Sequence, residues 1–212
     1  MLKIEVVVYE WLPEAIAQSE LIFQKFSLKP KFRLYPPATP DKIGQCEQFL
    51  GLSLPYSYRE FLLKHNGAHL FCSDTAAYAA PEIWWSNSGV VVFGIEALLA
   101  YRQHLQWIYA LSDSLESPFP VPIAYPGRIL TGDFCALKCA LKMDELANDE
   151  YPVMSCEQDC DPLDWKEHII ASSFEGWLKK MFSHVIEQES FPEYWLKDDL
   201  RLCFHDSIDQ DF

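Results

Sequence analysis

The sequence of 212 residues predicts an α+β domain, in which a mixed or antiparallel sheet is packed by several helices. Two short helices stand next to each other between residues 39 and 68, each with its own start and stop signals. A wider amphipathic pattern predicts a third helix over residues 169–186. Short apolar runs of strand type, such as residues 90–93, lie between them. At this length and with half of the residues apolar, one folded domain is expected.

The two short helices are the clearest local signal. The first is expected over residues 39–50, because Thr39 can cap it and Gly51 stands where a left-handed residue ends a helix. The second is expected over residues 55–65, opened by Pro55 and stopped by Asn66-Gly67. Apolar side chains repeat at helical spacing in both, at Ile43, Cys46 and Leu50 and then at Tyr58, Phe61 and Leu62. These features describe a scaffold and no chemistry.

The remaining elements follow from the same rules in chain order. Alternation predicts a strand at residues 2–8, then a helix at 13–26 and a strand at 29–35. Residues 90–93 are expected as a strand and residues 95–110 as a helix. Four prolines between residues 112 and 126 indicate a loop or an extended edge segment. Further strands are expected at residues 129–138 and 151–155, before the helix at 169–186.

Several of these stretches resemble the SUKH superfamily. The opening signature is carried by Glu47, Gly51, Leu54-Pro55, Tyr58, Phe61-Leu62 and Asn66-Gly67. Residues 132–135, 151–153 and 171–178 also fit, so the resemblance spans roughly residues 39–182. The superfamily contains toxin-immunity proteins, Smi/Knr-type cell-wall regulators and Syd-type secretion-channel-binding proteins. The resemblance implies a SUKH-like domain over residues 39–190, preceded by a strand–helix extension (1–38) and followed by an acidic tail (191–212).

The net charge of −14 is concentrated in the last third of the chain. Residues 1–143 hold 13 acidic and 12 basic side chains, whereas residues 144–212 hold 18 acidic and 5 basic ones. One interpretation is a solvated acidic face, and the other is a docking surface for a basic partner. Direct binding of nucleic acid is disfavoured, because phosphate contacts need lysine and arginine side chains.

Seven cysteines in a chain with an adequate apolar core indicate reduced thiols, some of them buried, as expected of Cys46 and Cys72. Two pairs share the same spacing, Cys135 with Cys139 and Cys156 with Cys160. Zinc binding by these four is one alternative, although Cys135 lies in an apolar strand pattern rather than a tight knuckle, and a disulfide or redox role is another. No metal or other cofactor is predicted.

The sequence indicates a protein that is not an enzyme. It lacks the nucleophile-elbow, phosphate-loop and dinucleotide-binding motifs, and no histidine pair has a metal-binding spacing. A Cys/His nucleophile pair assembled in space is the remaining catalytic alternative. Glu5 and Glu10 interrupt the apolar start of the chain, which argues against a secretory signal and predicts a cytosolic location.

The predicted function is non-enzymatic protein binding. As the resemblance implies, the lead hypothesis is an immunity protein that neutralises a toxin, such as a basic nuclease, through an acidic surface. The alternative is a scaffold or regulator of the Smi/Knr type with no toxin partner. The predicted contact residues are Glu145, Asp149, Glu150, Glu157, Asp159, Asp161 and Asp164, with the paired tryptophans Trp84 and Trp85 as an apolar anchor.

Overall fold

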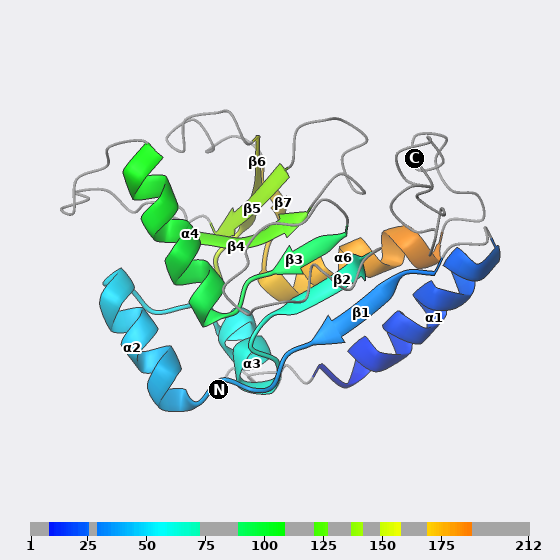
Figure 1. Cartoon of the computed structure of the whole chain (residues 1–212), viewed down its shortest axis with the longest axis horizontal. Helices are drawn as coiled ribbons and strands as arrows, with labels where there is room; N and C mark the ends of the chain where they lie inside the picture. Colours follow the sequence, from blue (N-terminus) through cyan, green and yellow to red (C-terminus); the bar gives the residue numbers. More distant parts are fainter. Residues whose placement is uncertain are drawn as a thin grey trace, which may run out of the picture.

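In the part of the chain that the structure describes, seven strands form one antiparallel sheet at the centre of the molecule (Figure 1). The structure, a computed structural model, describes residues 9–25, 29–72, 89–108, 121–126, 137–141, 149–157 and 169–187. The strands lie in the sheet in the order in which they occur in the sequence. They are β1 (Lys31–Leu34), β2 (Ala68–Cys72), β3 (Val90–Val92), β4 (Val121–Pro126), β5 (Leu137–Leu141), β6 (Val153–Glu157) and β7 (Ile169–Ala171). Every pair of neighbours is antiparallel, and the predicted α+β class is confirmed.

Helices pack around this sheet. They are the short 3-10 helix η1 (Tyr9–Trp11), α1 (Leu12–Lys25), α2 (Pro40–Leu50), α3 (Tyr56–Lys64), α4 (Ile95–Ile108) and α6 (Phe174–Ile186). Helix α6 contacts both α1 and α3, and α2 contacts both α3 and α4. In Figure 1, α2 and α4 lie together at the end of the molecule opposite α1.

The ends of α2 and α4 show why the chain folds locally as it does. The Thr39 side chain accepts a hydrogen bond from the backbone N–H of Lys42 (3.3 Å), and Gly51 ends α2 with a left-handed φ of 69°. Asn66 follows α3, and its Oδ1 accepts a hydrogen bond from the backbone N–H of Ile95 (2.9 Å) at the start of α4. The residue that stops one predicted helix therefore caps another.

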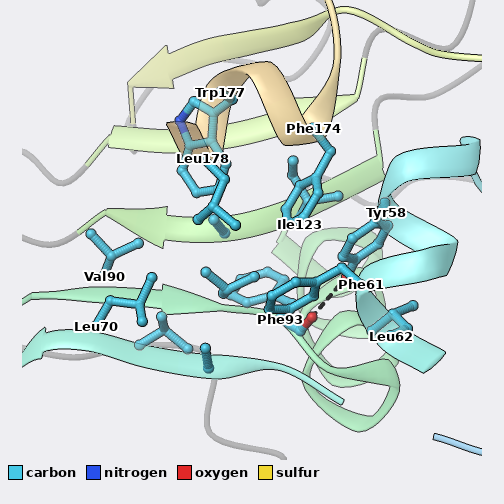
Figure 2. Packing of buried hydrophobic residues seen from close by; sticks show 14 of the residues in the cluster. Tyr58, Phe61, Leu62, Leu70, Val90, Phe93, Ile123, Phe174, Trp177 and Leu178 are labelled. Carbon is cyan, nitrogen blue, oxygen red and sulfur yellow. Dashed lines mark hydrogen bonds between the residues drawn. The ribbon is translucent and has the colours of Figure 1, made fainter. Parts of the chain in front are cut away.

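Aromatic and aliphatic side chains from α3 and α6 form the core over one face of the sheet (Figure 2). Figure 2 shows Tyr58 and Phe61 of α3 close to Phe174 of α6 and to Ile123 of β4. Complete burial of such side chains contributes roughly 1.5–3 kcal/mol each. The buried Tyr58 hydroxyl is satisfied, because it donates a hydrogen bond to the backbone oxygen of Phe93 (2.8 Å).

Residues before position 39 belong to the same core. Strand β1 pairs with β2, and the pairing shifts between Lys31 and Arg33, where β2 contains an additional residue. Phe71 in this bulge has a φ of 56°, an uncommon conformation for a bulky side chain. Its ring lies 5.8 Å from that of Phe23 in α1 and 5.1 Å from that of Phe182 in α6. The bulge thus places one fully buried ring between the first and the last helix.

Two predictions about elements were wrong in part. The helix predicted over residues 169–186 begins only at Phe174, because Ser173 caps it and residues 169–171 form β7. Residues 121–126 are neither a loop nor an edge, since β4 lies between β3 and β5. The pairing of β4 shifts between Pro122 and Ala124, which is where a sheet tolerates the missing N–H of proline.

The other predicted elements agree with the structure where it describes them. The helices at 13–26 and 95–110 and the strands at 29–35, 90–93 and 151–155 appear with shifted ends, and β2 was not predicted at all. The strand predicted at residues 2–8 and most of the one at 129–138 lie outside the described residues.

Candidate functional site

The start of helix α3 is completed by a residue far along the chain. Pro55 at the N-cap position provides no side-chain hydrogen bond. Instead, the carboxylate of Glu150 accepts two hydrogen bonds from Ser57, one from its backbone N–H and one from its hydroxyl, each 2.7 Å long. A carboxylate at this position also interacts favourably with the positive end of the helix dipole.

The residue before Glu150 is exposed. Asp149 has a left-handed φ of 60°, and its backbone oxygen accepts a hydrogen bond from the N–H of Tyr56 (2.8 Å). The turn at residues 149–150 is therefore attached to α3 by both of its members. Asp149 directs its own charge to the solvent beside the first turn of the helix.

Helix α6 and the N-terminal segment meet at the same serine. The Ser57 hydroxyl accepts a hydrogen bond from the backbone N–H of Glu175 (3.3 Å), and the Ser57 backbone oxygen accepts one from the Tyr9 hydroxyl (2.6 Å). The Glu175 carboxylate accepts a hydrogen bond from Trp11 Nε1 (3.3 Å) and forms an ion pair with Lys179 (2.9 Å). We refer to this set as the junction cluster; it comprises Tyr9, Trp11, Ser57, Glu150, Glu175 and Lys179.

Burial and like charge dominate the electrostatics of the junction cluster. Burial raises the pKa of Tyr9, and the charges of Glu175 and Glu150 raise it further. Burial also raises the pKa of Glu150, against the two hydrogen bonds from Ser57 that favour its charged form. Ser57 is only 1% exposed. The hydrogen bond between its hydroxyl and the Glu150 carboxylate therefore joins two segments inside the fold.

The signature residues of the SUKH resemblance are used inside the fold. Glu47 accepts a hydrogen bond from the backbone N–H of Leu54 (2.9 Å) and approaches Arg59 at 3.9 Å. Gly51 ends α2, Asn66 caps α4, and Tyr58 is fully buried. These residues specify the scaffold, so selectivity for a partner must come from other side chains.

The structure describes only some of the predicted contact residues. Asp149 is exposed, whereas both carboxylate oxygens of Glu150 already accept hydrogen bonds from Ser57. Glu157 is the last residue of β6 and pairs with Leu137 of β5. Outside the described residues lie Glu145, Asp159, Asp161, Asp164, Trp84 and Trp85, which remain predictions.

The cysteines are placed only in part. Cys139 and Cys156 lie on the neighbouring strands β5 and β6, where Cys156 pairs with Lys138. Cys135 and Cys160 lie outside the described residues, so the zinc alternative stays untested. In the described part of the chain no three His, Cys, Asp or Glu side chains form a potential metal site. Cys46 and Cys72 are buried, and burial raises the pKa of the Cys46 thiol to about 11.

Most of the junction cluster was not predicted from the sequence. Tyr9, Trp11, Ser57 and Glu175 were not singled out, because the hydrogen bonds that join them to other segments connect residues between 48 and 164 positions apart. The signal that was available is local: a proline at the N-cap position of α3 leaves the first N–H groups without a side-chain acceptor. Such a helix start requires an acceptor from elsewhere.

The fold and the junction cluster describe an α+β domain that joins distant segments of its chain through buried polar contacts. A comparison with protein families identifies the group: the sequence profile of the SMI1 / KNR4 family (SUKH-1) matches residues 37–180. This match covers more than half of the chain, and the protein belongs to the SMI1/KNR4 family. Membership supports a general role as a protein-binding module of the immunity or regulatory kind, in a family whose members are generally not enzymes.

The chain is also similar to a curated protein, the uncharacterized protein YnaB of Bacillus subtilis (strain 168). The two are 31% identical over 72 residues, which is 34% of this chain and 39% of the relative. The similarity thus covers well under half of either protein. Separately, none of the helices in the described ranges has both the length and the apolar character needed to cross a membrane.

Proposed function

We propose that this protein is a cytosolic immunity protein that neutralises a toxin by direct binding through an acidic surface. The observation that carries the proposal is the family match over residues 37–180, because it supports a protein-binding role. The charge distribution supports a particular kind of partner. A net charge of −13 over residues 144–212 favours a basic partner, such as a nuclease domain that binds phosphate.

Asp149 is the described residue that fits this role best. Its carboxylate is exposed, and the hydrogen bond from Tyr56 to its backbone oxygen holds the turn in place. A carboxylate in a fixed position loses little conformational freedom when a partner binds. Glu150 is assigned a different role, since its two oxygens are occupied by Ser57.

The proposal is tested first by searching the genes next to this one in its native genome for a toxin, such as one with a basic nuclease domain, whose toxic domain is then produced. The two purified proteins are mixed, and the association rate is measured between low and physiological salt. Steered association is expected to approach about 10⁸ M⁻¹s⁻¹ at low salt and to fall as salt is added. Co-expression of this protein is expected to restore growth of cells that express the toxin.

Charge-neutralised variants show which surface is responsible. Asp149→Asn combined with neutralisation of Glu145, Glu157, Asp159, Asp161 and Asp164 is expected to slow association and to flatten its salt dependence. The matched control neutralises exposed acidic residues outside that stretch, with Glu14→Gln, Glu20→Gln and Asp41→Asn. Equal effects in both sets would contradict an acidic docking surface, and growth that is not restored would contradict the immunity role.

The Smi/Knr-type scaffold remains the alternative outcome. It would be supported if the gene has no toxin neighbour and the protein binds a housekeeping partner without salt dependence. Alanine substitution of Trp84 and Trp85 then tests the apolar anchor, because tryptophan side chains at the centre of an interface often contribute roughly 2 kcal/mol or more.

A further inference from the structure

Ser57 is the point at which four separate segments of the chain meet. It belongs to α3, donates two hydrogen bonds to Glu150 in the 149–150 turn, and accepts one from Glu175 in α6. The hydroxyl of Tyr9 in η1 donates a hydrogen bond to its backbone oxygen. Any change in the Glu150 carboxylate therefore acts on contacts that involve all four segments.

Glu150 is surrounded mainly by negative charge. Glu175 faces it from α6, and Asp149 lies next to it in its own turn. Glu60 of α3 adds a further carboxylate near the Tyr9 hydroxyl. Among the described residues, Lys179 is the cation that contacts this group, and it contacts Glu175 rather than Glu150. Burial, together with these charges, disfavours the charged form of Glu150 and outweighs the hydrogen bonds from Ser57 that favour it.

We propose that Glu150 is a proton-linked latch. Loss of its negative charge as the pH falls strengthens the attachment of the N-terminal segment and of the 149–150 turn to the junction of α3 and α6. The neutral carboxyl keeps an acceptor for the Ser57 N–H, and its own O–H can donate to the Ser57 hydroxyl. The repulsion between Glu150 and Glu175 disappears at the same time.

The direction follows from linkage. The pKa of Glu150 is raised in the folded protein, so the folded state binds this proton more tightly than the unfolded chain does. The stabilisation is fully present below the unfolded pKa and is lost as the pH rises through the folded pKa. The latch therefore tightens as the pH falls through the folded pKa of Glu150, and it does not require the proposed toxin partner.

Hydrogen exchange of the full chain tests the latch. Peptides that cover residues 9–12 and 56–60 are measured between pH 5 and pH 8, with correction for the intrinsic exchange rate. Glu150→Gln, which resembles the protonated form, is the reference, because the acid destabilisation expected from His69 affects both proteins alike. Relative to this variant, the original protein is expected to be several-fold less protected at pH 8, and its relative protection should rise towards equality as the pH is lowered.

Two further variants separate charge from geometry. Glu150→Ala removes the acceptor and should lower protection at every pH. Glu175→Gln removes the facing charge but keeps an acceptor for Trp11, and it should shift the rise in protection to lower pH. If Glu150→Gln followed the pH profile of the original protein, or lost as much protection as Glu150→Ala, the latch would be disproved.

A titration that needs no variant gives an independent test. The side-chain carboxyl carbons of the 13C-labelled protein are followed by NMR as the pH is lowered. The midpoint for Glu150 is expected above 4.5, the ordinary value for a glutamate side chain. A midpoint at or below that value would exclude the proposal, whatever the exchange experiments show.

Discussion

His69 is a histidine inside the sheet whose ring is 1% exposed. It lies in β2 opposite Arg33 of β1, and its ring is 5.5 Å from that of Tyr35. Burial, and then the charge of Arg33, lower the pKa of His69 to about 4. The side chain is therefore neutral in the folded protein at physiological pH.

This pKa predicts a specific loss of stability in acid. The unfolded chain takes up the proton near pH 6.5 and the folded protein only near pH 4, so protonation favours unfolding as the pH falls between these values. The contribution is present in full above pH 6.5, and its loss amounts to about 3 kcal/mol. Denaturant unfolding from pH 7 to pH 4 should show this loss, and His69→Phe should lack it. Equal pH slopes in the two proteins would contradict the assignment.

The residues that the sequence could predict are those whose role is local. Thr39 and Gly51 act within their own helix, so the capping rules identified them. Glu150 was selected for its charge, yet its hydrogen bonds go to Ser57, 93 positions away. No local pattern connects two such residues. Sequence reasoning therefore found the scaffold and missed the junction cluster.

Helix α2 contains Gly44 and is followed by Gly51, and these two glycines differ in backbone conformation. Gly44 lies within the helix, and a Cβ atom added there would meet nothing within 4 Å. Gly51 has equally open surroundings but a φ of 69°. The space around the two residues is thus similar, and only the backbone distinguishes them.

Alanine substitutions should consequently have opposite effects. Gly44→Ala is expected to stabilise the protein by about 0.5–1 kcal/mol, because alanine loses less conformational freedom in a helix. Gly51→Ala is expected to destabilise it by about 1 kcal/mol, because an L side chain disfavours the left-handed conformation. Thermal unfolding of the two variants measures the difference. A stabilising Gly51→Ala would show that the C-terminal end of α2 is not held in this conformation.

At the scale of elements, the errors of prediction have physical causes. All five residues of β2 are buried, so the strand lacks the alternation that identifies a half-exposed strand. The apolar residues of β7 continue the helical pattern of α6, and only the cap at Ser173 separates the two elements. Ser173, between the two apolar runs, was the available signal for the boundary. The helical spacing of the apolar residues outweighed it in the prediction.

The whole molecule uses its N-terminal segment as part of the core. Leu12 and Phe23 are fully buried, and α1 packs against α6 near the other end of the described chain. The family profile begins only at residue 37, so these contacts join residues outside the match to residues inside it. We expect residues 9–38 to unfold together with the rest.

A matched pair of substitutions on α1 tests this coupling. Phe23→Ala should lower the free energy of unfolding of the whole protein by about 3–5 kcal/mol, because it leaves a cavity beside Phe71. Leu21→Ser, at a side chain that is 60% exposed, should change it by no more than about 0.5 kcal/mol. Fluorescence and circular dichroism should report one transition in each variant. Two separate transitions, with only the first affected, would instead indicate an independent N-terminal extension.

The sequential order of the seven strands has a consequence during synthesis on the ribosome. Each strand that emerges finds its neighbour already made, so the sheet can grow by addition at one margin without waiting for distant segments. Helix α1 is different, because α6, with which it packs, is translated after all seven strands. A nascent chain of this protein would therefore carry a growing sheet while the surface of α1 that α6 covers is still exposed to solvent.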